Sequence, residues 1–506
     1  MNTASVNVVG LEYLLFLFGL CCGTPSVGGA TPPSFVNFAA PAPLGQSAGE
    51  PSIGVNWKTG NVMMQAGLET LRVSSFDDST GTARWESVGA TVTSATSLDP
   101  ILFTDRSTGR TFVSQLTAGC SFTAFTDDDG TNWFQNPIGC GVASGADHQT
   151  VGGGPFAPGT SGLSAYTNAV YYAAQSGVGA SCSLSRDGGI TFGPGVPMYK
   201  LLECGGLHGH LKVAPDGTVY VPNAHCNGQQ AVIVSTDSGT FWQVRHVPGS
   251  STQDESDPSV GIGSGGTVYL GFQNGNGHPY AAASRDQGVS WTNLQDVGTA
   301  FGIQNCQFPA VVAGDDDRAA FAFLGTTAPG DDQSDTFTGV WHLYVAATYD
   351  GGATWTTVDA TPNDPVQRGC IWLSGGSNPC RNLLDFMDVT VDRQGRILVG
   401  YADGCTGDCV PGNSNSRSAV ATIARQSAGT GLFASFDPAA LGIQFLNSNV
   451  IISWPMSATN LLLEQTQGLT NPDWTRSTNM PTTVNGQFQI VESAGYVTRF
   501  YRLRGQ

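Results

Sequence analysis

A short motif recurs along most of the chain, and it constrains the fold more than any other feature of the sequence. Each copy reads Ser or Thr, any residue, Asp, any residue, Gly, any residue, a polar residue and an aromatic residue, with Phe241 at the polar position of the third copy. The copies begin at Thr126, Ser185, Ser235, Ser284 and Thr348, and their aspartates are 49 to 64 residues apart. A motif repeated at such intervals is typical of repeat architectures.

The residue types of this motif indicate a tight turn between two strands. The Asp side chain caps the backbone of the turn, Gly adopts a positive φ, and the aromatic residue packs back between strands. Apolar residues precede the copies, as at 231–234 and 344–347, where they predict a strand. We therefore interpret the carboxylates of the motif as scaffold rather than as a catalytic series.

A second repeat consists of a polar residue, an apolar strand, a turn at Gly or Asp, and a second strand that often ends in a polar residue. Its seven copies begin at Glu50, Asp99, Asp147, His208, Asp257, Gln307 and Asp385. The second strands end at Gln65, Gln115, Gln175, Asn223 and Gln273, and at Tyr401 with Asp403. Seven copies predict seven structural units, or six if one copy pairs irregularly.

The first motif resembles the Asp-box, or bacterial neuraminidase repeat, of sialidase-like β-propellers, and the resemblance covers roughly residues 50–427. It implies an all-β fold of four-stranded blades, with the Asp-box in the turn between the third and fourth strands. Together with the second repeat it predicts seven blades, whereas six would match the familiar sialidases. It also implies a carbohydrate-active hydrolase of the exo-α-sialidase type, with a glycan or glycoconjugate as substrate.

The two ends of the chain differ from the repeats. Residues 14–22 form the only long apolar run, which is too short to span a bilayer and resembles the core of a signal peptide cleaved after Ala30. An ordinary buried segment stays the alternative, because no Lys or Arg precedes the run. After Phe436 the repeat stops, and the remainder resembles the small β-sandwich modules of secreted bacterial proteins. We predict a signal peptide at 1–30, the propeller at 31–440, a small β module at 441–506, and a secreted bacterial protein without a membrane span.

The cysteine count fits an oxidising compartment. Of the 12 cysteines an even ten follow the predicted cleavage site, and none has the CxxC spacing of a zinc ribbon or a thioredoxin site. Proximity along the chain suggests four pairs and leaves a fifth, Cys226–Cys306, as the remainder, although spacing alone leaves the connectivity open. These pairs are Cys120–Cys140, Cys182–Cys204, Cys226–Cys306, Cys370–Cys380 and Cys405–Cys409.

The charge composition of the chain argues against one class of binding partner, nucleic acids. The chain has 21 Lys and Arg against 39 Asp and Glu, a formal net charge of -18, and only three lysines. Such a negative field disfavours contact with phosphate backbones, so we expect no nucleic-acid partner. The 67 glycines suit a β-rich chain with many tight turns. We expect a monomer.

Propeller geometry gathers the starts of the second repeat around the central axis, on the face opposite the Asp-box turns. The predicted catalytic residues are Asp99, Asp257, Glu50, Asp147, His148, His208, His210 and Asp385. The predicted substrate-binding residues are Arg381, Arg368, Gln65, Gln115, Gln273 and Tyr401. Carboxylates and imidazoles around a concave mouth favour ligand binding and push pKa values apart. For each single residue a structural interpretation stays open, because an Asp-Pro or Glu-Pro step also caps a turn.

Three functions remain open for this face. The resemblance implies a sialidase mechanism with a Tyr nucleophile, an Asp acid/base and three arginines. Residues 47–52 read SAGEPS where the first arginine motif of sialidases belongs, so this motif is missing. A different glycosidase would instead use two carboxylates of this face, such as Asp99 and Asp257. A polysaccharide lyase would use His208 or His210 as base and Arg381 against a uronate. A non-catalytic propeller would bind glycans or proteins there, with Ca²⁺ as a structural ion. No cofactor is required for hydrolysis, and an acidic mouth disfavours acidic sugars unless a cation bridges them.

Overall fold

The computed structural model describes residues 30–505 except for short gaps at 96–98, 118–120, 137–138, 140–146, 177–178, 201, 253–255, 413–414, 438–440, 457–460, 471, 485–486 and 495–497. The chain divides into two compact units, Ala30–Ala434 and a second unit that contains Ser435–Gln506. Nearly all of the predicted signal peptide lies outside the described residues. No helix within the described ranges is long and apolar enough to cross a membrane.

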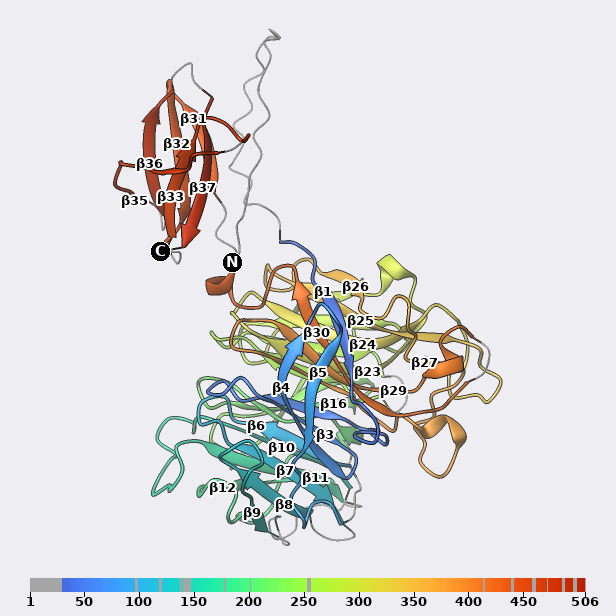
Figure 1. Ribbon diagram of the computed structural model, residues 1–506. Coiled ribbons are helices and arrows are strands. Elements are labelled where there is room, and N and C mark those ends of the chain that lie inside the picture. Colours follow the sequence, from blue (N-terminus) through green and yellow to red (C-terminus); the bar gives the residue numbers. More distant parts are fainter. Residues whose placement is uncertain are drawn as a thin grey trace. The chain divides into compact units, whose positions relative to one another are not determined.

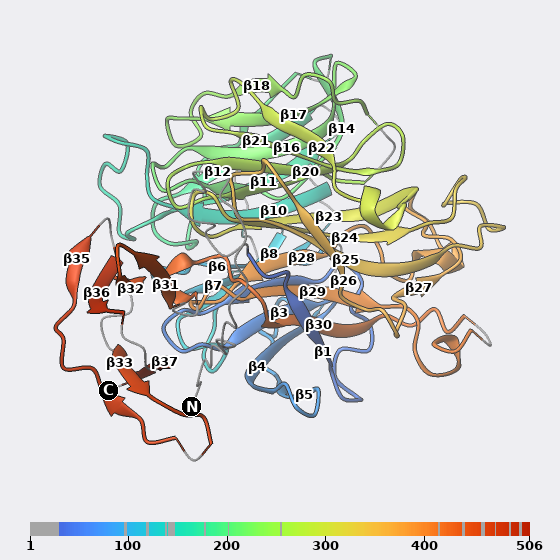
Figure 2. The same ribbon diagram turned by 90° about the horizontal axis from the view of Figure 1, so that it is seen from above.

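The described strands of the first unit form seven antiparallel sheets (Figures 1 and 2). The first sheet contains β2 (Ser52–Val55), β3 (Val62–Ala66), β4 (Glu69–Asp77) and β5 (Thr82–Ser87). The second contains β6 (Ile101–Thr104), β7 (Thr111–Leu116), β8 (Ser121–Thr126) and β9 (Phe134–Asn136). The third contains β10 (Asp147–Gly154), β11 (Ala169–Ser176), β12 (Gly179–Ser185) and β13 (Val196–Pro197). The fourth contains β14 (Cys204–His208), β15 (Lys212–Val213), β16 (Val219–Cys226), β17 (Gln229–Ser235) and β18 (Gln243–His246).

The remaining sheets follow the same order. The fifth contains β19 (Ser259–Ile262), β20 (Val268–Gln273), β21 (Pro279–Ser284) and β22 (Thr292–Asp296). The sixth contains β23 (Asn305–Ala313), β24 (Ala319–Thr326), β25 (Val340–Thr348) and β26 (Thr356–Asp359), with β27 (Gln367–Arg368) beside β25. The seventh contains β28 (Asp388–Val391), β29 (Ile397–Asp403), β30 (Val420–Ala428) and β1 (Ser34–Ala39). The helices are single 3-10 turns, η1 (Thr299–Phe301), η2 (Pro379–Arg381), η3 (Gly407–Cys409) and η4 (Ala434–Phe436).

The innermost strands close into a ring. In the order β2, β6, β10, β15, β19, β23 and β28, each contacts the next, and β28 contacts β2. A side chain on one innermost strand often accepts a hydrogen bond from the backbone N–H of the next. These bonds join Ser52 Oγ to Leu102 (2.7 Å), Thr150 Oγ1 to Leu211 (3.0 Å), Ser259 Oγ to Val311 (2.9 Å) and Asp388 Oδ2 to Ile53 (3.2 Å). The fold is therefore a β-propeller, and the last bond links its final sheet to its first.

The seventh sheet is completed from the other end of the unit. Its outermost strand is β1, which pairs antiparallel with β30 so that Phe38 lies opposite Ile423. Figure 1 shows blue β1 beside orange β30. The seventh repeat has no fourth strand of its own, and β1 removes the open sheet edge that would otherwise remain.

All five copies of the first motif lie between the third and fourth strands of their sheets. In the copy at Asp187, the carboxylate accepts hydrogen bonds from the Ser185 hydroxyl (2.8 Å) and from the backbone N–H of Thr191 (2.9 Å). The Ser185 hydroxyl accepts one from Gly189 N–H (2.9 Å). Gly189 has φ +91°, and a Cβ there would lie 2.8 Å from Phe112 Cε1, so only glycine fits. The expected turn chemistry is present, and these carboxylates are engaged within their own turns.

The second unit consists of two sheets. One contains β31 (Gly442–Leu446), β32 (Asn449–Pro455), β36 (Gln487–Ser493) and β35 (Thr482–Val484), and the other contains β34 (Thr475–Arg476), β33 (Leu461–Thr466) and β37 (Phe500–Gly505). Its core joins Ile452, Trp454 and Ile490 of the first sheet to Leu463 and Leu503 of the second. The sheets therefore pack face to face as a small β-sandwich.

The disulfides differ in part from the predicted pairs. The bonds Cys370–Cys380 and Cys405–Cys409 are confirmed. The predictions Cys182–Cys204 and Cys226–Cys306 are wrong, because Cys204 is paired with Cys226, which lies directly opposite it across β14 and β16. Cys182 and Cys306 are buried free thiols. The predicted pair Cys120–Cys140 lies outside the described residues.

Candidate functional site

A cavity of about 490 Å³ lies at the starts of the innermost strands, and we call it the mouth. Six residues predicted from the sequence line it: Asp99, Asp147, His148, Asp257, Arg381 and Asp385. They precede or begin β6, β10, β19 and β28, which belong to four different sheets. Closure of the propeller therefore brings together residues that are up to 286 positions apart along the chain (385 minus 99).

The backbone at the strand starts adopts an uncommon conformation. Positive φ angles occur at Glu50 (55°), Asp99 (46°), His148 (50°), Phe308 (57°) and Leu384 (60°), each at or just before an innermost strand. Few residues other than glycine adopt this conformation. The pairing register also shifts near the starts of β10, β14 and β23, which are bulges that redirect side chains. Repeated backbone strain at one face is typical of functional sites.

His148 is the centre of a charged network. Its backbone N–H donates to Asp99 Oδ2 (2.8 Å), and its ring Nε2 contacts Asp257 Oδ2. Burial opposes the imidazolium charge, but Asp257, Asp99 and Asp385 outweigh burial and raise the pKa of His148 to about 9. His148 is therefore an imidazolium at neutral pH, and burial raises the pKa of its partner Asp257.

A second ion pair lies across the mouth. Arg381 donates from Nη2 to Asp385 Oδ2 (2.6 Å) and from Nη1 to Asp385 Oδ1 (2.5 Å), and its Nη1 also donates to the Leu373 carbonyl (3.0 Å). Arg381 ends η2 in the loop before β28, where Asn378 caps the 3-10 turn. The Cys370–Cys380 disulfide holds the ends of this loop segment together. A local cap and a covalent bond thus position the guanidinium.

Burial raises the pKa of two acids near this pair. Glu50 is 3% exposed and lies behind the mouth, where burial, the charges of Asp385 and Asp99, and a hydrogen bond with Asp385 raise its pKa well above the ordinary value. Burial also raises the pKa of Asp99, which the charges of Asp147 and Asp385 increase further. The surroundings therefore raise the pKa of Glu50 and Asp99, while Asp385 is held by the guanidinium of Arg381.

The predicted amides do not reach the mouth. Gln65 is fully buried, donates to the Gly67 carbonyl (2.7 Å) and accepts from the Thr70 hydroxyl (2.7 Å). Gln115 donates to the same carbonyl (3.0 Å), and Gln273 is 3% exposed. Since the second strands lie behind the innermost ones, these side chains are enclosed between sheets.

Arg368 and Tyr401 are also engaged elsewhere. Arg368 donates to the carbonyls of Cys409 (2.9 Å) and Val410 (3.0 Å), which secures the η3 loop. Tyr401 is 3% exposed, and its hydroxyl donates to Asn37 Oδ1 across the seventh sheet (3.2 Å). Arg381 is the one predicted substrate-binding residue that the structure places at the mouth.

The two predicted histidines of the fourth sheet are separated. His208 is buried, its ring edge faces His148, and burial with the His148 charge lowers its pKa to about 3. His210 instead lines a different cavity farther along the channel and packs against Phe386. The pair is not on one regular strand, because β14 ends at His208.

Sequence reasoning missed three polar residues that line the mouth, His225, Ser256 and Ser374. His225 follows the predicted strand end Asn223 by two residues, but the pairing of β16 with β17 shifts register between Asn223 and Cys226. His225 therefore lines the mouth while Asn223 is fully buried. Ser256 directly precedes Asp257, and its hydroxyl accepts from Phe308 N–H (3.1 Å). Strand alternation therefore gave no signal for His225, and Ser374 lies in the long loop between β27 and β28.

Fold and cavity together define a β-propeller whose central mouth is lined by carboxylates. No protein-family profile matches the sequence, and no curated protein matches it. Among solved structures, a GH74 enzyme of Niastella koreensis is 14% identical at a TM-score of 0.43, covering 92% of this chain and 72% of that chain. The Hadza microbial sialidase Hz136 is 14% identical at a TM-score of 0.38, and the match covers 73% of each chain. The PL25 ulvan lyase is 10% identical at a TM-score of 0.38, and the match covers 74% of this chain and 94% of that chain. Likenesses this remote transfer no activity to this chain.

Proposed function

We propose that the protein is a glycoside hydrolase that cleaves a neutral or cationic glycan at the mouth. The placement of Asp99 and Asp385 in one cavity supports this most. Burial raises the pKa of Asp99, whereas Asp385 accepts a bidentate ion pair from Arg381 in the same cavity. Glycoside hydrolysis uses two carboxyl groups of one site, one as the proton donor and the other as the nucleophile or base.

Each group then has a role. Asp99 donates its proton to the leaving glycosidic oxygen as the bond to the anomeric carbon breaks. Asp385 either attacks that carbon or takes a proton from the attacking water, so that water finally supplies the new hydroxyl. The Asp257–His148 ion pair, with Ser256 nearby, provides hydrogen-bonding groups for sugar hydroxyls.

Charge sets the substrate class. Besides Asp99, which carries the transferred proton in this proposal, three carboxyl groups line the mouth, Asp147, Asp257 and Asp385, against the cations of Arg381 and His148. Among the described lining residues Arg381 is the one arginine, and it is paired with Asp385. A sialate or uronate carboxylate would meet repulsion here, so the exo-α-sialidase activity implied by the Asp-box resemblance has less support than hydrolysis of an uncharged or amino sugar.

A panel of fluorogenic glycosides tests the proposal. We expect turnover of a neutral hexoside, an N-acetylhexosaminide or a glucosaminide, none of an α-sialoside, and at least about a 100-fold loss in Asp385→Asn. Asp237→Asn in a distant turn is the matched control and keeps full activity. Turnover unaffected by Asp385→Asn, or no turnover of any glycoside by the folded protein, contradicts hydrolysis at the mouth. Retention on a glycan array without turnover would identify a non-catalytic propeller, and an unsaturated product absorbing in the ultraviolet would identify a lyase.

A further inference from the structure

A second cavity, of about 420 Å³, lies in the channel beyond the mouth. Residues at and just after the far ends of the innermost strands line it, including Arg106 after β6 and Lys212 in β15. Its size is within the range of small-molecule sites, about 300–1,000 Å³. None of its lining residues lines the mouth, so it is a separate site.

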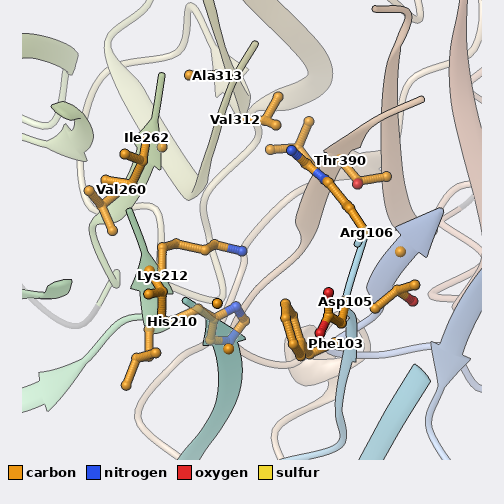
Figure 3. Close-up of a pocket in the computed structure, with 18 of the residues that line it drawn as sticks. Phe103, Asp105, Arg106, His210, Lys212, Val260, Ile262, Val312, Ala313 and Thr390 are labelled. Atoms are coloured by element: carbon orange, nitrogen blue, oxygen red, sulfur yellow. The ribbon is translucent and has the colours of Figure 1, made fainter. Parts of the chain in front are cut away.

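Two cationic side chains point into this cavity. Figure 3 shows the Lys212 ammonium and the Arg106 guanidinium directed toward the same space from opposite walls. Within the described part of the chain, neither side chain has a hydrogen-bond acceptor. Lys212 Nζ is 3.8 Å from Asp388 Oδ1, beyond hydrogen-bond distance, and Arg106 Cζ lies 5.1 Å from the Trp57 ring centroid. Together they offer eight N–H donors.

The acidic residues of the cavity are already engaged. Asp388 accepts from the backbone N–H groups of Ile53 (3.2 Å) and Val389 (2.9 Å). Asp105 accepts five hydrogen bonds, two of them from Tyr166 and Asn168. The cavity therefore has an excess of unsatisfied donors, which a ligand rich in acceptors would satisfy.

The other walls are apolar. Val260, Ile262 and Val312 line one side, and Phe103 lies below Arg106 and beside His210 in Figure 3. We propose that this cavity binds a small organic anion, whose carboxylate or sulfate group is held by Arg106 and Lys212 while its apolar part packs against these side chains. The proposal is independent of the proposed hydrolase, because it uses no residue of the mouth.

The charge states fit this ligand class. Burial lowers the pKa of Arg106 to about 10, so the guanidinium is still charged at neutral pH. Burial and the neighbouring Lys212 lower the pKa of His210 well below its ordinary value, so that ring is neutral. The guanidinium is therefore available to an anion, and His210 adds a neutral hydrogen-bonding group.

Calorimetry on the full chain tests the site with benzoate, phenyl sulfate and the neutral isostere benzamide. We expect benzoate or phenyl sulfate to bind at least tenfold more tightly than benzamide, and the tighter of the two identifies the preferred oxyanion. Equal binding of benzamide, or no binding of either anion, overturns the proposal. This comparison uses the unaltered protein and therefore does not depend on the folding of any variant.

Variants then locate the site. We expect Arg106→Gln and Lys212→Met each to weaken binding of the better anion by at least about tenfold. Arg84→Gln removes the same charge at a side chain that is 71% exposed and keeps the affinity, as does Asp99→Asn at the mouth. Unchanged affinity in both channel variants, with native circular dichroism, overturns the assignment.

Discussion

The carboxylates of the repeated turns and those of the mouth are the same chemical group in opposite environments. In the turn at Asp286, hydrogen bonds from Ser290 and Ser284 lower the pKa of the carboxyl group. In the mouth, burial and neighbouring charges raise the pKa of Glu50 and Asp99. One environment stabilises the ionised form and the other the protonated form.

The two kinds of carboxylate differ in how far along the chain their hydrogen-bonding and charged partners lie. Asp286 finds its partners within four residues along the chain, at Ser284 and Ser290. Asp99 meets His148 at a separation of 49 residues, and His148 meets Asp257 at 109. Turn carboxylates are therefore set by local sequence and suit a scaffold. Asp99 and Asp257 meet His148 only when the ring closes, whereas Asp385 pairs locally with Arg381 and is brought to the mouth by the ring.

The largest expected effect separates the two groups by activity. Asp99→Asn should lower kcat/KM for the best glycoside by about 10²- to 10⁴-fold, because the proton donor is lost, with little change in the unfolding midpoint. Asp286→Asn removes a carboxylate from a turn and should leave kcat/KM unchanged. Equal activity loss in both variants would abolish the distinction.

The next effect is a pH dependence of stability that originates in the mouth. The folded-state pKa of His148, about 9, lies above its ordinary 6.5, so its stabilisation is complete below pH 6.5 and is lost as pH rises through 9. Urea unfolding should show a loss of up to about 3 kcal/mol over this window. His148→Gln should flatten the curve there, and a curve of unchanged slope in this variant would refute the ion pair.

A smaller effect tests how the mouth is held. Replacing Cys370 and Cys380 by serine should cost about 2–3 kcal/mol of stability and lower kcat/KM about tenfold, because the loop that carries Arg381 loses its constraint. Replacing Cys405 and Cys409 is the matched control, since that bond closes a loop whose residues do not line the mouth. Equal activity in the two variants would show that the first disulfide does not position Arg381.

The smallest expected effect is a loss of stability from a substitution in the turn at Asp286. Ser284→Ala removes the hydroxyl that donates to Asp286 (2.8 Å) and accepts from Gly288 N–H (2.7 Å). We expect a loss of about 1 kcal/mol in the free energy of unfolding and no change in kcat/KM. An altered kcat/KM would mean that the turns contribute to the mouth.

The repeats made the β-propeller and the strand starts at the mouth predictable. The second repeat placed Asp99, Asp147, Asp257 and Asp385 at equivalent positions, and ring closure brings equivalent positions together. The polar ends of the second strands followed the same pattern but lie one layer farther out, so Gln65 is enclosed where a ligand-binding role was predicted. The polar residues of both strands look alike in the sequence pattern. The order of the strands in each sheet decided which of them line the mouth and which are enclosed behind it.

The amino-acid sequence by itself determined the turns, the strand periodicity and the acidic character of the strand starts, because each depends on residues within a few positions of one another. Tertiary structure alone decided that β1 completes the last sheet, that Cys204 bonds Cys226, and that Arg106 and Lys212 meet in the channel. Those contacts join segments whose separation along the chain carries no local signal. The pairing of β1 with β30 and the shared cavity of Arg106 and Lys212 arise only once the ring has closed, whereas the Cys204–Cys226 bond depends on the pairing of β14 with β16 within one sheet.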